Sequence, residues 1–179
     1  MGKIFDTITP ELAAWIEAQK MFLVGTAPAT TDGHVNVSPK GLDTLRILGP
    51  TSVAYLDFFG SGAETLAHVR ENQRIVFLFC AFEGAPKIVR LHGRGSAVLP
   101  EHDEWEELAA KFPDLPGRRA IVRAELTRIA DSCGFGVPKL DYVGDRDTLQ
   151  RSAEKKTEED FARYRAEKNA TSLDGLPVF

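Results

Sequence analysis

Three polar side chains in one short segment have the types and spacing to hold a ligand through hydrogen bonds and charge. Residues 34–41 alternate them with Val35 and Val37, which is the period of a strand with one apolar and one polar face. The polar set consists of Asn36, Ser38 and Lys40, with Pro39 between the last two. An amide, a hydroxyl and an ammonium in one row beside a hydrophobic core predict a polar partner for this face.

A glycine-rich turn follows the next predicted strand. That strand spans residues 52–59 and includes Leu56 and Asp57, while residues 63–72, with Thr65 in their first turn, have helical character. Between them stands Gly60-Ser61-Gly62. Backbone N–H groups and the positive end of a helix dipole point out of such a turn, and glycines let an anion approach closely. The turn therefore predicts a phosphate site.

The same turn has a second interpretation. Ser61 and Glu64 have the spacing of a capping box, in which the two side chains satisfy the N–H groups of the helix start. The Glu64 carboxylate would also repel a phosphate. On these residues alone the capping box is favoured.

A row of cationic side chains lies on a third segment. Residues 87–99 alternate in polarity, and one face carries Ile88, Arg90, His92 and Arg94. An arginine fork matches the oxygens of a phosphate in pairs. Arg90 or Arg94 is therefore the favoured source of positive charge for an anion, and direct contact between that anion and the glycine turn stays open.

Composition excludes several other kinds of site. The 22 basic and 26 acidic residues include no Lys- or Arg-rich block, so nucleic acid is not an expected partner. The four histidines lack metal-binding spacings, and neither a P-loop nor a dinucleotide-binding glycine motif in a βαβ unit is present. No segment approaches the ~20 apolar residues of a membrane helix, so no membrane partner is expected.

The two cysteines, Cys80 and Cys133, match neither a disulfide framework nor a zinc site. A reducing cytoplasm is therefore the predicted location. Cys133 stands among small residues, which favours a tight turn over a reactive thiol.

The order of the predicted elements indicates a single domain over residues 1–179 that is mainly β with flanking helices (α+β). The expected helices are 9–21, 63–72, 101–112 and 145–169, and the expected strands are 22–27, 34–41, 52–59, 74–82, 87–99 and 119–129. Residues 74–82 form an apolar run typical of a strand buried on both faces. Antiparallel strands joined by short turns favour a barrel. Residues 145–179 form a predicted C-terminal helical extension.

Taken in order, these segments resemble the pyridoxamine 5′-phosphate oxidase-like flavoproteins over roughly the first two-thirds of the chain. The motifs that carry the resemblance are Asn36-Val37-Ser38-Pro39-Lys40-Gly41, Tyr55-Leu56-Asp57, Gly60-Ser61-Gly62, Thr65-Leu66, Glu71-Asn72, Arg74 to Phe79 and Arg90-Leu91-His92-Gly93-Arg94. Residues 132–138 resemble a loop of one uncharacterised branch of that family. The resemblance implies an antiparallel split β-barrel of the FMN-binding type, a homodimer, and FMN in a cleft between the subunits.

The resemblance also implies roles for individual residues. Residues 35–40 would edge the isoalloxazine ring, with the Ser38 hydroxyl and the Lys40 ammonium as donors, and Asp57 would anchor the turn by hydrogen bonds. The family often carries arginine where this chain has Gly62 and Ala63, which is a departure from its pattern. The predicted cofactor-binding residues are Val35, Asn36, Val37, Ser38, Pro39, Lys40, Leu56, Asp57, Ser61, Gly62, Thr65, Arg90, Arg94 and Cys133.

The leading functional hypothesis is an FMN-dependent oxidoreductase that passes electrons between an unidentified small molecule and an acceptor. No catalytic acid or base is assigned, because the flavin carries the chemistry. Two alternatives stay open: another cofactor, such as haem or a deazaflavin, or a flavin-binding module without turnover. Because the C-terminal helix has few apolar residues, its Phe161 and Tyr164 are expected to pack against the partner subunit.

Overall fold

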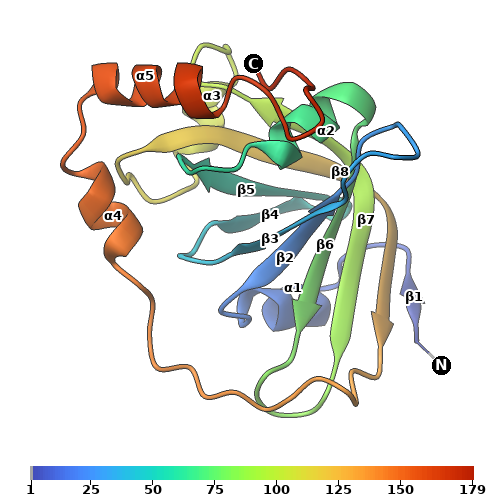
Figure 1. The fold of residues 1–179 in the computed structure, drawn as a ribbon. Helices are drawn as coiled ribbons and strands as arrows, with labels where there is room; N and C mark the ends of the chain where they lie inside the picture. Colours follow the sequence, from blue (N-terminus) through green and yellow to red (C-terminus); the bar gives the residue numbers. More distant parts are fainter. Residues whose placement is uncertain (1) are drawn as a thin grey trace.

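The structure, a computed structural model, describes residues 2–179 and shows a strongly curled antiparallel sheet with helices around it (Figure 1). The predicted domain begins at residue 1, which lies outside the described residues. The strands are β1 (Ile4–Phe5), β2 (Phe22–Thr26), β3 (Asn36–Lys40), β4 (Leu45–Gly49), β5 (Ser52–Phe58), β6 (Arg74–Cys80), β7 (Ile88–Val98) and β8 (Arg118–Ser132). The helices are α1 (Pro10–Glu17), α2 (Glu64–Asn72), α3 (Trp105–Ala109), α4 (Thr148–Ala153) and α5 (Glu158–Lys168).

The sheet has the strand order β3-β2-β6-β7-β8-β5-β4, and β1 pairs with β8 off this path. Every pairing is antiparallel. The 15-residue β8 pairs with β7 along most of its length and with β5, so it joins the two halves of the sheet. The prediction of a mainly β, antiparallel fold with flanking helices is confirmed.

The main core fills the inside of the curl and is rich in aromatic rings. Phe22 lies 5.9 Å from Tyr55 and 5.6 Å from Phe79, measured between ring centroids. Helices α1 and α2 close this core with apolar side chains such as Leu12 and Leu66, both almost fully buried. A second, smaller core lies under α3.

Because of these two cores, β5 is buried on both faces. Val53 and Tyr55 belong to the main core, whereas Ala54 and Leu56 belong to the core under α3. The sequence had indicated β6 as the doubly buried strand. That prediction was wrong, because only alternate residues of β6 are buried and its other face is partly exposed.

Several local predictions are confirmed. Thr9 caps α1, with its hydroxyl accepting the Leu12 N–H at 3.3 Å, and proline follows it at the first helical position. Strands β2 and β3 form the predicted hairpin, with Thr26 opposite Asn36.

Other local predictions need correction. The predicted capping box is absent: Ala63 caps α2, and no side chain accepts an N–H there. Strand β4 was not predicted. Of the predicted helix 101–112 only α3 is α-helical, because the turns before and after it have i→i+3 hydrogen bonds.

The C-terminal part folds back over the barrel. The predicted helix 145–169 is divided into α4 and α5, because Thr157 and Asp160 form a capping box that starts a new helix. Phe161 and Tyr164 of α5 lie 5.1 and 5.8 Å from Phe59, so this helix packs on its own chain; its contact with a partner subunit stays a prediction.

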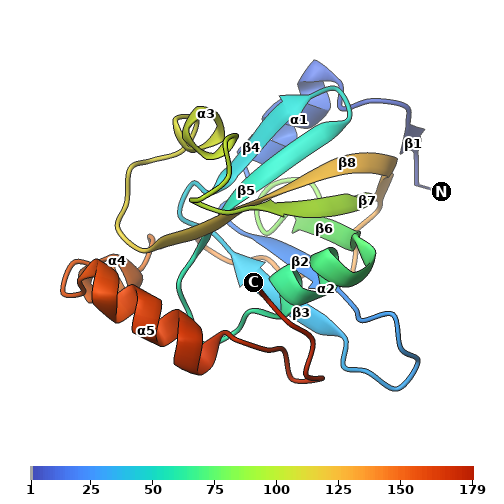
Figure 2. The same cartoon turned by 90° about the horizontal axis from the view of Figure 1, so that it is seen from above.

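Beyond α5 the chain passes beside α2 (Figure 2), and Val178 enters the main core. Among the described helices, none combines the length and apolar character needed to cross a membrane.

Candidate cofactor site

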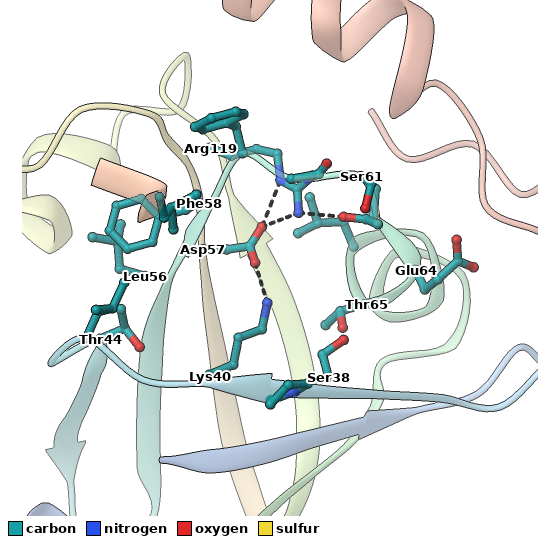
Figure 3. A pocket seen from close by; sticks show the side chains of 18 of the residues that line it. Ser38, Lys40, Thr44, Leu56, Asp57, Phe58, Ser61, Glu64, Thr65 and Arg119 are labelled. Carbon is teal, nitrogen blue, oxygen red and sulfur yellow. Dashed lines mark hydrogen bonds and ion pairs between the residues drawn. The ribbon is translucent and has the colours of Figure 1, made fainter. Parts of the chain in front are cut away.

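A cavity of about 370 Å³ lies between β3, the end of β5 and the glycine turn that leads into α2 (Figure 3). This volume falls within the range of small-molecule sites, about 300–1,000 Å³. Its lining includes Asn36, Ser38, Pro39, Lys40, Thr44, Leu56, Asp57, Gly60, Ser61, Gly62, Thr65 and Arg119. The structure therefore brings the predicted polar strand and the predicted turn to the same cavity.

The alternation of β3 sends its polar residues to the cavity and its valines to the surface. Asn36, Ser38 and Lys40 line the cavity, whereas Val35 and Val37 are 73% and 61% exposed. Strand β3 is an edge strand that pairs only with β2, which is compatible with a proline at position 39.

A short hydrogen-bond network holds this polar row. The Asn36 amide donates to the Thr65 hydroxyl at 3.1 Å, and the Ser38 hydroxyl donates to the Asn36 amide oxygen at 3.2 Å. Thr65 belongs to α2, so the network ties the edge strand to the helix that begins at the turn. The row is thereby fixed before any ligand arrives.

Asp57 forms a buried ion cluster with Lys40 and Arg119 at the floor of the cavity (Figure 3). The Lys40 ammonium lies 2.8 Å from one carboxylate oxygen, and the Arg119 Nε and Nη2 lie 2.8 and 2.7 Å from the other. Burial works against the charged form, but the two cations outweigh it and hold the pKa of Asp57 below its usual value. The Asp57 carboxylate is therefore held in its ionised form between two cations.

Arg119 connects this cluster to the glycine turn. Its Nη2 donates to the Gly62 carbonyl at 2.9 Å, and its Nη1 lies 3.4 Å from the Gly60 carbonyl and 3.0 Å from the amide oxygen of Asn169. All five N–H groups of the guanidinium are thus directed at protein acceptors. Asp57 anchors the turn, as predicted, but it does so through Arg119.

Sequence reasoning did not find Arg119 or Asn169. Arg119 stands at the start of a long strand, and its meeting with Asp57 depends on the register that places Asp57 opposite Ala120. One signal was available, because a buried carboxylate such as Asp57 needs a cation beside it. The sequence alone does not identify which basic residue is that cation.

The turn itself is open. An added Cβ at Gly60 or Gly62 would meet no atom within 4 Å, and in the described chain the N–H groups of Ser61, Gly62 and Ala63 donate to no protein acceptor. Glu64, whose charge was expected to repel a phosphate, points away from Lys40 and Asp57 (Figure 3). Its two carboxylate oxygens accept the N–H of Leu173 at 3.1 and 3.2 Å.

Five predicted cofactor residues lie outside the lining of this cavity: Val35 and Val37, which face the surface, and Arg90, Arg94 and Cys133. Arg90 donates to the Ser132 hydroxyl at 3.1 Å, Arg94 approaches the Gln73 amide oxygen at 3.5 Å, and Cys133 is exposed. A role for them at the cofactor would require the cavity of a second subunit, and it stays a prediction. Groups of three or more metal-ligating side chains are absent from residues 2–179.

A second cavity, of about 510 Å³, lies beyond Phe59 and Arg119, under α5. It is lined by aromatic side chains, among them Trp105, Phe161 and Tyr164, together with scattered charged groups. It is larger than the first cavity but has neither a row of donors nor the open turn. The first cavity is therefore the better candidate.

Comparison with known proteins points to one family. A model of the pyridoxamine 5′-phosphate oxidase family matches residues 8–133. The pyridoxamine 5′-phosphate oxidase family protein ustO of Aspergillus flavus is 35% identical over 194 aligned positions, which cover 99% of this chain and 78% of that protein.

Two solved structures show the same fold. A variant of HupZ from Group A Streptococcus has a TM-score of 0.56 at 22% identity, over 70% of this chain and 99% of the other. A protein from Mycobacterium smegmatis, described as FAD-binding, has a TM-score of 0.50 at 18% identity, over 73% of this chain and 96% of the other. The family resemblance and the predicted split-barrel fold are confirmed by these comparisons together.

Proposed function

The chain belongs to the pyridoxamine 5′-phosphate oxidase family, and we propose that it binds FMN in the cavity between β3 and the glycine turn and serves as a flavin-dependent oxidoreductase. The observation that carries the proposal is the composition of that cavity. A fixed row of polar side chains on β3, ending in the Lys40 ammonium, faces a glycine turn whose N–H groups donate to no acceptor within residues 2–179.

The donors of β3 suit the edge of an isoalloxazine ring, which carries nitrogen and carbonyl acceptors. The ammonium of Lys40 has three N–H groups, of which Asp57 takes one, so the others can donate to the ring. The Ser38 hydroxyl lies on the same face of the strand; its one proton goes to the Asn36 amide oxygen, so the hydroxyl would rotate to donate to the ring. These groups would orient the ring without any rearrangement of the strand.

The glycine turn suits the phosphate. The N–H groups of Ser61, Gly62 and Ala63 are adjacent along the chain and directly precede α2. Successive free N–H groups of this kind form an anion site. Arg119 is fully engaged with protein acceptors, so its role is to hold the turn rather than to bind the phosphate directly. Arg90 and Arg94 remain candidates for additional charge from a partner subunit.

When bound, the flavin would supply the electron transfer. Lys40 would stabilise negative charge that the ring gains on reduction, because a fixed cation close to it favours the reduced form. Asp57 keeps Lys40 in place, and because Arg119 is a second cation on the same carboxylate, the cluster of two cations and one anion carries a net positive charge. The substrate in this proposal is a small molecule.

The visible absorption spectrum of the purified protein tests this proposal. We expect two broad bands of oxidised flavin, either as isolated or after addition of FMN and removal of the excess. Haem, one of the alternative cofactors on the same fold, would give one intense sharp band. A colourless protein that retains neither added FMN nor added FAD would rule the proposal out.

We also propose that the protein is a homodimer. Val35 and Val37 are exposed on the edge strand beside the cavity, where a second subunit would cover them and complete the site. Sedimentation velocity at micromolar concentration should therefore show a dimer. A monomer that still binds FMN tightly would contradict a site built between subunits.

A further inference from the structure

The residue that completes the glycine turn comes from the C-terminal segment, 109 positions away in sequence. Asn169 follows α5 and is 1% exposed. Its amide nitrogen donates to the Gly60 carbonyl at 2.9 Å and lies 3.5 Å from the Ser61 carbonyl, and its amide oxygen accepts from Arg119 at 3.0 Å. Asn169 and Arg119 thus bind three consecutive carbonyls of the turn.

Binding these carbonyls fixes the direction of the N–H groups. In a planar trans peptide, the C=O of one residue and the N–H of the next point in opposite directions. The carbonyls of Gly60, Ser61 and Gly62 point toward Arg119 and Asn169, so the N–H groups of Ser61, Gly62 and Ala63 point away from them. These three N–H groups donate to no acceptor in the part of the chain that the structure describes.

The C-terminal segment is held in place on both sides of Asn169. Before it, Phe161 and Tyr164 of α5 pack on Phe59. After it, the Leu173 N–H donates to Glu64, and Asp174 accepts from the backbone and ring N–H of His34 at 2.8 and 2.7 Å. These contacts also direct the charge of Glu64 at the C-terminal segment instead of at the turn.

We propose that Asn169 is a positioning residue for the cofactor phosphate, because it holds the turn with three N–H groups presented to an anion. This inference rests on the proposed binding of FMN. It makes the C-terminal segment a determinant of affinity for the phosphate, although none of its residues contacts the phosphate. The ring, held by β3, does not depend on Asn169.

Equilibrium titration of FMN and of riboflavin, which lacks the phosphate, tests the inference with Asn169→Ala. We expect FMN affinity to fall about ten-fold or more, while riboflavin affinity changes by less than about two-fold. A residue needed only for general stability would lower both affinities together. Where the alanine variant does not fold, Asn169→Ser keeps a polar group in the buried position but is too short to reach the carbonyls.

Asn72→Ala is the matched control. It removes an amide of the same type at the opposite end of α2, where it donates to the Ala27 carbonyl at 2.8 Å, and it should leave both affinities unchanged. Equal losses for FMN and riboflavin in the Asn169 variant, or no loss, would overturn the inference while leaving the proposed function intact. A parent protein that binds neither flavin would overturn the proposed function and this inference with it.

Discussion

Replacing Asp57 with alanine should lower the free energy of unfolding by about 3–5 kcal/mol, the range for breaking a buried ion pair. The carboxylate is 2% exposed and is the shared acceptor of Lys40 and Arg119. Its loss leaves the Arg119 guanidinium buried without a counter-charge and removes the anchor of the glycine turn. Chemical denaturation, compared with the parent protein, measures the effect.

The surface pair of Asp114 and Arg118 offers a matched control. Its two charged atoms are also 2.8 Å apart, but the Asp114 side chain is 89% exposed, so Asp114→Ala should change stability little. Equal effects of the two substitutions would contradict the assignment of Asp57 as a buried anchor.

The pH dependence of the Asp57 effect has a definite sign. The folded pKa of Asp57 lies below the ordinary value of 3.8, because Lys40 and Arg119 outweigh the opposing effect of burial. A carboxylate of this kind adds stability above its unfolded pKa and loses that contribution as the pH falls through its folded pKa. The difference in the free energy of unfolding between the parent and Asp57→Ala should therefore have its full size at neutral pH and should shrink below pH 3.8.

Replacing Lys40 with methionine should lower the affinity for both FMN and riboflavin by roughly 10- to 150-fold. This corresponds to the loss of one hydrogen bond from a charged donor to the ring, which contributes about 1.5–3 kcal/mol. The bound flavin should also become harder to reduce, because the positive charge beside the ring is lost. Affinity is measured by titration, and reduction by a spectroscopic redox titration.

Lys87→Met controls for the loss of a lysine. Lys87 also has a carboxylate partner, Asp131 at 4.0 Å, and lies 4.9 Å from an aromatic ring, that of Trp15, but it is outside the cavity. The Lys87→Met substitution should therefore leave flavin binding unchanged. An unaltered affinity and redox behaviour in Lys40→Met would remove Lys40 from the ring site.

The same titrations with Arg90→Ala test the prediction that Arg90 supplies positive charge to the cofactor phosphate. If a partner subunit supplies Arg90 to the phosphate, FMN affinity should fall by roughly 10- to 150-fold and riboflavin affinity should hardly change. If Arg90→Ala binds FMN like the parent while Gly62→Glu abolishes binding, the phosphate is held by the turn alone.

Patterns with a short period predicted much of the site. The alternation from Val35 to Lys40 correctly separated the cavity face of β3 from its exposed face, and the glycines at 60 and 62 marked the turn. Such signals depend on neighbours in sequence, so they are readable without the fold. The capping-box spacing of Ser61 and Glu64 shows their limit, because α2 begins two residues later than a cap at Ser61 requires and the Glu64 carboxylate accepts the N–H of Leu173 instead.

The residues that were missed act over long distances along the chain. Arg119 is 62 positions from Asp57, and Asn169 is 109 positions from Gly60. Nothing near Asn169 in sequence indicates burial, since it follows a charged helix without a single fully buried residue. Its contact with the turn depends on the packing of α5 against Phe59.

Hydrogen–deuterium exchange with and without FMN is the most direct test that the flavin occupies this cavity. We expect FMN to slow exchange in β3 and at Ser61, Gly62 and Ala63, whose N–H groups have no acceptor in the described chain. Exchange in α3, which lies outside the cavity, should not change. Protection confined to the second cavity under α5, or FMN binding with no protection of β3 and the glycine turn, would contradict the proposed site.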